Sequence, residues 1–157
     1  MSRLAAALST HLGSRQVARV IYGAIIGLAL VVALEQHPPT PGVVAATLAA
    51  TAVAVGLAEL YSDMVAGRER FTNSLGEAGA VTFGAAFPAV FFVLAALDVM
   101  EPQTAFDVAA WSGVGLIAFY GFAAARLAGS TPLAALMKAL AVAVIGVALI
   151  AFKAILH

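Results

Sequence analysis

The sequence predicts an all-α, polytopic membrane protein in which about five transmembrane helices form one bundle. Of its 157 residues, 63% are hydrophobic and 10% are charged, whereas soluble domains carry about 25% charged residues. The apolar residues fall in runs close to the ~20 residues with which a helix crosses the hydrocarbon core of a bilayer. These runs are continuous and rich in alanine and leucine, so they favour helices over the short alternating strands of a membrane barrel.

Turn-forming residues divide the chain into these spans and the short loops between them. A proline-rich turn at 35–41 follows the first span, because proline removes a backbone donor. The polar segment Gly67 to Gly76 ends the second, and a turn containing Pro102 ends the third. Gly129 stops the fourth helix and Pro132 opens the fifth, as is typical of helix ends and starts. The expected spans are 17–35, 42–66, 77–98, 104–127 and 132–156.

Residues 1–16 precede the first span and are expected to lie at the cytoplasmic surface of the membrane. This segment has no acidic residue and places Leu4, Leu8 and Leu12 four residues apart, which suits a short helix lying on the bilayer. An organellar transit peptide has a similar composition. Residues 17–157 then make up the transmembrane domain.

Basic and acidic residues gather at opposite ends of the expected bundle. Arginines lie before the first span, between the second and third, and at the end of the fourth: Arg3, Arg15, Arg19, Arg68, Arg70 and Arg126. The opposite loops carry acidic residues with no lysine or arginine: Glu35, Asp98, Glu101 and Asp107. Because cytoplasmic loops carry an excess of basic residues, we expect a cytoplasmic N-terminus and an extracytoplasmic C-terminus.

Charge and motifs argue against several classes of function. The formal net charge is zero, which does not favour a nucleic-acid partner. The chain has no cysteine, and His11, His37 and His157 lie far apart in tails or loops. No zinc-protease, nucleophile-elbow, P-loop or dinucleotide-binding motif is present. We therefore expect that the protein is not an enzyme, and the sequence names no cofactor.

The end of the second span holds the most informative polar cluster. Glu59, Ser62 and Asp63 fall on one face of a helix at 100° per residue. An acid within the membrane costs ~2.5–3.5 kcal/mol on insertion scales and usually faces a cavity or an ion route. With the thioether of Met64, the two carboxylates offer ligands for a divalent cation, which is then a candidate substrate.

Two of these interpretations have plainer alternatives. If the second span ends near Leu60, both acids lie among the lipid headgroups and pair with Arg68 or Arg70 in weak surface salt bridges. Lys138 lies about two turns inside the fifth span. It either neutralises an acid of the second span or lines the route, or its amine extends to the headgroups.

Two further patterns predict helix packing. Gly23 and Gly27 form a small-xxx-small motif in the first span, which lets two helices approach closely, within the chain or across a symmetric dimer. Pro88 lies inside the third span and is expected to kink it. The phenylalanine stripe on the same helix is expected to pack: Phe83, Phe87 and Phe91.

Several short motifs together resemble the vacuolar iron transporter family. The segment 19–24 (RVIYGA) is similar to the opening of that family's first span, and 58–62 (AELYS) resembles the glutamate-containing stretch that closes its second. The segment 85–88 (AAFP) resembles its proline-bearing third span, and 120–130 the end of its fourth. The resemblance implies five spans, a cytoplasmic N-terminus and a homodimer.

The chain departs from the family at its transport residues. Where the family has an asparagine and a metal-binding aspartate in the first span, this chain has Ile25 and Ile26. The long acidic insertion after the second span is also missing, since only Gly67 to Gly76 lies there. Of the family's transport residues, only Glu59 carries over by position, with Met64 as a near neighbour.

Two functions from different classes are therefore expected. The first is a small homodimeric transporter that moves a divalent cation or a proton-coupled solute along a route containing Glu59. The alternative is a non-transporting membrane scaffold or subunit that assembles with a partner through its Gly23/Gly27 face.

Overall fold

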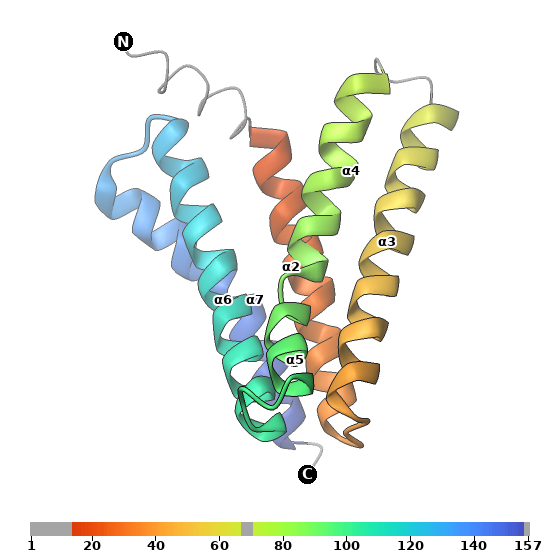
Figure 1. Ribbon diagram of the computed structural model, residues 1–157. Helices are drawn as coiled ribbons and strands as arrows, with labels where there is room; N and C mark the ends of the chain where they lie inside the picture. The colour runs from red at the N-terminus through yellow and green to blue at the C-terminus, as the bar shows by residue number, and fades with distance from the viewer. Residues whose placement is uncertain (1–13, 67–70, 156–157) are drawn as a thin grey trace.

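In the computed structural model, six helices account for nearly all of the described chain, which comprises residues 14–66 and 71–155 (Figure 1). The helices are α2 (Ser14–Glu35), α3 (Pro41–Val65), α4 (Phe71–Ala86), α5 (Ala89–Ala96), α6 (Pro102–Leu127) and α7 (Pro132–Ile155). The expected surface helix within residues 1–16 falls largely outside the described residues, as do Arg68 and Arg70. The all-helical bundle predicted from composition is confirmed.

Three of these helices, α2, α3 and α6, are individually long and apolar enough to cross a bilayer. The pair α4 and α5 meets the same test as one span bent by 47°. Its bend coincides with Phe87 and Pro88, so the kink predicted at this proline is confirmed. The last apolar run forms α7, whose segment Pro132–Ala148 is a shorter apolar helix.

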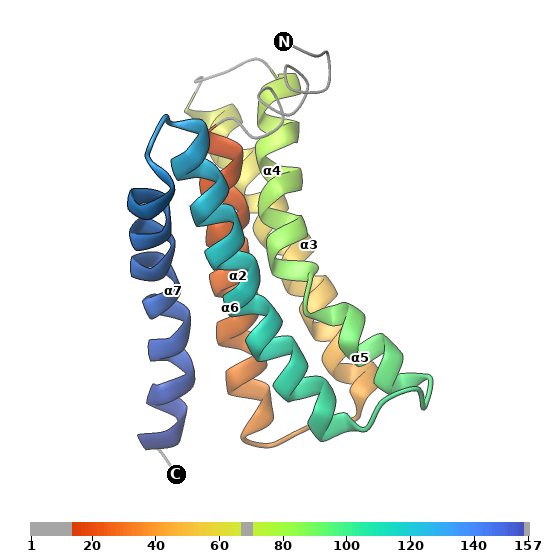
Figure 2. The ribbon, with the colours of Figure 1, turned by 90° about the vertical axis from the view of Figure 1, so that its left-hand side faces the viewer.

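The helices pack as one bundle with α2 at its centre, where it contacts α4, α6, α3 and α7. On one side α3 packs against α4 and α5, and on the other α6 packs against α7, as the two views show (Figures 1 and 2). The end of α3, the start of α4 and the α6–α7 turn lie at the same end of the bundle as the start of α2. We call this end, which carries Arg19 and Arg126, the arginine end, and the opposite end, which carries Asp98 and Glu101, the acidic end.

One predicted boundary is wrong in a way that matters for the site. The expected loop Gly67 to Gly76 is shorter, because the helix α4 already begins at Phe71. A helix can extend beyond the apolar core into the polar interface, and polarity alone does not mark its end. Glu77 therefore lies six residues inside α4 and not at the mouth of a loop.

The α6–α7 turn confirms the predicted helix stop and start. Gly129 has a φ of 81°, and the Ser130 amide donates to the Ala125 carbonyl, closing the helix in the way that glycine favours. The Ala134 amide donates to Thr131 Oγ1 at 3.3 Å, so Thr131 caps α7 and Pro132 occupies its first position.

Glycines bring α2 and α4 into backbone contact. A Cβ added at Gly23 would clash with the Val81 carbonyl oxygen, and one at Gly27 would lie 2.8 Å from the Ala85 carbonyl oxygen. From the other side, a Cβ at Gly84 would clash with the backbone of α2. The small-xxx-small motif thus serves packing within the chain. Because α4 covers this face in the structure, the scaffold alternative would need another face to bind its partner.

The phenylalanine stripe also packs as expected. Phe83 and Phe87 have ring centroids 6.2 Å apart, and Phe87 and Phe91 lie 5.8 Å apart edge to face, so the stripe continues across the bend at Pro88. This edge-to-face geometry is favourable for aromatic rings.

Candidate functional site

Three carboxylates from two helices meet near the arginine end of the bundle. Glu59 and Asp63 come from α3, and Glu77 comes from α4. One oxygen of each lies within 4.8 Å of the others. Glu77 is buried, with 10% of its side chain exposed, and Glu59 retains 14% exposure. We call these residues the carboxylate cluster.

Arg19 of α2 joins the two most buried members of this cluster. Its Nη1 forms an ion pair with Glu59 Oε1, and its Nε donates to Glu77 Oε2 at 3.1 Å. A single guanidinium thus links α2, α3 and α4. Buried charges are stable in a protein interior only when paired in this way. Asp63, by contrast, forms no ion pair with any described residue.

Helix register explains why these residues meet. Arg19 lies five residues after the start of α2, Glu59 six before the end of α3, and Glu77 six after the start of α4. At 1.5 Å per residue, each lies about 8–9 Å inside the arginine end. Asp63 is one turn nearer that end. The carboxylates therefore form a short inward path from the end of the bundle to the Arg19 ion pairs.

The other predicted site residues lie away from this cluster. Ser62 is exposed, and Met64 is 61% exposed, although their neighbours Glu59 and Asp63 are half-buried. Of the predicted site residues, the structure therefore brings Glu59 and Asp63 together, and it adds Glu77. Ser62 and Met64 are more exposed than these acids.

Lys138 does not neutralise an acid of the second span. It is exposed on α7, and its Nζ donates to Ser130 Oγ at 3.0 Å. Its amine thus turns back toward the arginine end, as expected for a lysine that extends to the headgroups. Arg19 plays the counter-charge role that the sequence suggested for Lys138.

The sequence interpretation missed two residues, Arg19 as a site residue and Glu77 altogether. Both had a usable signal. Arg19, Gly23 and Gly27 recur every four residues, so the arginine lies on the helix face that packs closely. Glu77, Val81 and Ala85 follow the same spacing on α4, which places the acid on the buried face. Glu77 is hard to recognise from the sequence because it is the first residue of the expected third span.

The charges of the carboxylate cluster are not balanced among the described side chains. Three carboxylates face one guanidinium among the described side chains, so the cluster carries excess negative charge when ionised. Such a cluster can accept a proton or bind a cation.

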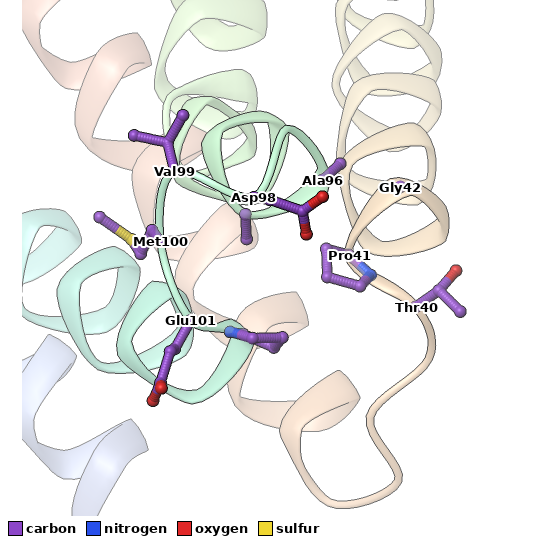
Figure 3. Close-up of a pocket in the computed structure, with 10 residues that line it drawn as sticks. Thr40, Pro41, Gly42, Ala96, Asp98, Val99, Met100 and Glu101 are labelled. Atoms are coloured by element: carbon purple, nitrogen blue, oxygen red, sulfur yellow. The ribbon is translucent and has the colours of Figure 1, made fainter.

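The acidic end has a different character. An open pocket of about 650 Å³ lies between the start of α3 and the α5–α6 turn, lined by residues that include Thr40, Pro41, Asp98 and Glu101. In Figure 3, Asp98 points across the pocket toward the start of α3, whereas Glu101 points away from it. Both acids are exposed, and neither forms an ion pair with a described residue.

Comparison with known proteins identifies no relative. The chain matches no family model, no curated protein and no solved structure. The resemblance to vacuolar iron transporters therefore rests on the short motifs alone and stays a prediction.

Proposed function

We propose that this protein transports a cation, or a solute coupled to protons, along a route that uses the carboxylate cluster. The observation that carries the proposal is the meeting of Glu59, Asp63 and Glu77 with only Arg19 as a described counter-charge. Ionisable groups inside a helical membrane bundle are costly and commonly belong to ion or proton routes. A purely structural ion pair would need one acid for the arginine, and three are present.

The position of the cluster supports a route. Asp63 is half-buried one turn outside Glu59, so an ion arriving at the arginine end meets it first. Glu59 and Glu77 follow, where the Arg19 ion pairs hold α2, α3 and α4 together. Binding of a cation to either glutamate weakens its pairing with Arg19. The occupancy of the cluster is thereby coupled to the contacts between three helices.

We further propose that the transporting unit is a homodimer in which α3 faces the second copy. One chain encloses little polar volume, and α3 is the least buried of the three individual spans. The cysteine-free sequence makes this easy to test. Leu57, 61% exposed on α3, should cross-link as Leu57→Cys in lipid. A Val144→Cys variant on the exposed face of α7 serves as the control, and equal cross-linking of the two would contradict the pairing.

Flux through reconstituted protein tests the function itself. Proteoliposomes should conduct protons or one member of a panel of cations. Glu59→Gln should lower that flux about tenfold or more, since it removes an ionisable group from the route. Asp107→Asn, which neutralises an exposed acid at the acidic end, should change it less than about twofold. Absence of flux in wild type, together with a co-purifying protein, would favour the scaffold alternative.

A further inference from the structure

We infer that Arg19 sets the ion specificity of the carboxylate cluster: it excludes divalent cations and leaves the proton as the ion that the cluster binds. This inference rests on the proposed transport function and names its ion. It follows from which oxygens Arg19 contacts, from its permanent charge and from the fixed position of its helix.

Arg19 occupies oxygens that a metal ion would need. It contacts Glu59 Oε1 through Nη1 and Glu77 Oε2 through Nε. Divalent cations such as Mg²⁺ take about six oxygen ligands, and manganese also prefers oxygen. Of the three carboxylates in the cluster, Asp63 alone has both oxygens free of described ion pairs. Each glutamate keeps one further oxygen, but that oxygen belongs to a carboxylate already paired with Arg19, so a divalent ion bound there would lie beside the guanidinium.

The charge of Arg19 cannot be removed to make room. A guanidinium stays protonated at every physiological pH, whereas a buried lysine can lose its proton. A divalent ion among these carboxylates would lie close to a fixed positive charge and be repelled by it. A proton bound to a carboxylate oxygen neutralises one charge and needs no coordination shell. It therefore competes with the guanidinium at one oxygen at a time.

The backbone of α2 holds Arg19 in place. Gly23, one turn further along α2, lies against the Val81 carbonyl of α4, and Gly84 lies against the backbone at Val20. Neither helix has room to slide toward the other at this level. The Arg19 side chain itself is one-third exposed, so only its own rotation, with loss of both ion pairs, would open the cluster to a metal.

Manganese binding to the purified protein tests this role. Mn²⁺ is the probe, because its electron paramagnetic resonance signal distinguishes free from bound ion. Wild type should bind no Mn²⁺ at the cluster. Arg19→Gln should bind one Mn²⁺ per chain, with a dissociation constant about tenfold or more below the highest Mn²⁺ concentration at which wild type shows no binding, and Arg19→Gln with Glu77→Gln should lose it. Arg126→Gln, which removes an exposed arginine at the same end, should behave as wild type.

Two results would overturn the inference. One is Mn²⁺ binding by wild type that disappears in Glu77→Gln, and the other is a folded Arg19→Gln variant that gains no binding. If Arg19→Gln does not fold, measurements on the wild-type protein test the inference. Proton flux that Mn²⁺ does not change supports it. Mn²⁺ binding that depends on the cluster overturns it. A failure of the transport proposal is distinguishable, because it appears as absent proton flux whatever the Mn²⁺ result.

Discussion

The acidic residues named at the two ends of the bundle differ in their burial and in their ion pairing. At the arginine end, Glu59 and Glu77 lie between helices and pair with Arg19, next to the glycine contacts of α2 and α4. At the acidic end, Asp98 and Glu101 are exposed around an open pocket. Solvated acids cost little to keep, whereas buried ones need compensation. The difference indicates that helix packing and ion pairs fix the positions of the charged side chains at the arginine end.

The largest difference in stability between the two ends is expected when one glycine at each end is replaced by alanine. Gly23→Ala near the arginine end should destabilise the protein by about 3 kcal/mol, because its Cβ clashes with the Val81 carbonyl oxygen and forces the helices apart. Gly42→Ala at the acidic end has open space around its Cβ and should stabilise α3 by about 0.5–1 kcal/mol. Unfolding in mixed micelles measures both. Equal effects would show that the α2–α4 contact is not close.

The next largest difference in stability is expected between substitution of Arg19 and substitution of an arginine outside the cluster. Arg19→Gln leaves two buried carboxylates without their partner and should cost about 2 kcal/mol, less than a fully buried pair because Arg19 is one-third exposed. Arg126→Gln loses only a hydrogen bond to the Ser130 carbonyl at an exposed helix end and should cost less than about 1 kcal/mol. Thermal denaturation in detergent compares the two variants, and a reversed order would refute the structural role of Arg19.

The smallest effect is expected at Asp98, where the acidic end carries backbone strain. Asp98 has a φ of 56°, a left-handed conformation that glycine adopts more readily than other residues. Asp98→Gly should therefore stabilise the protein by about 0.5 kcal/mol, and Asp98→Ala should destabilise it by a similar amount. The same denaturation assay applies. A loss of flux in Asp98→Gly would instead assign this acid to the transport route.

The sequence predicted the helices better than the site, for a physical reason. Apolar runs and turn residues act locally, so the helices, the Pro88 kink and the Gly129 turn follow from the sequence alone. The partner of Glu59 depends on how three helices pack, which is a long-range property. Arg19 was therefore assigned only to orientation, and the predicted pairing partners Arg68 and Arg70 lie outside the described residues.

Glu77 is a second residue whose role depends on how the helices pack. Its importance depends on α4 beginning at Phe71, and the polar residues before Glu77 were assigned to a loop. In the structure this face of α4 is buried from Ser74 onward, where α4 packs against α2. Site residues at the edges of apolar runs are thus the ones that composition misplaces.

Proton flux through proteoliposomes containing Glu77→Gln tests the central claim most directly, because Glu77 is the most buried acid of the carboxylate cluster. The variant keeps the size and a hydrogen-bonding group beside Arg19 and removes only the ionisable group. We predict a loss of flux of about tenfold or more, whereas Glu101→Gln at the acidic end retains flux within about twofold of wild type. Full flux in a folded Glu77→Gln protein would contradict the assignment of the cluster as the ion-binding centre.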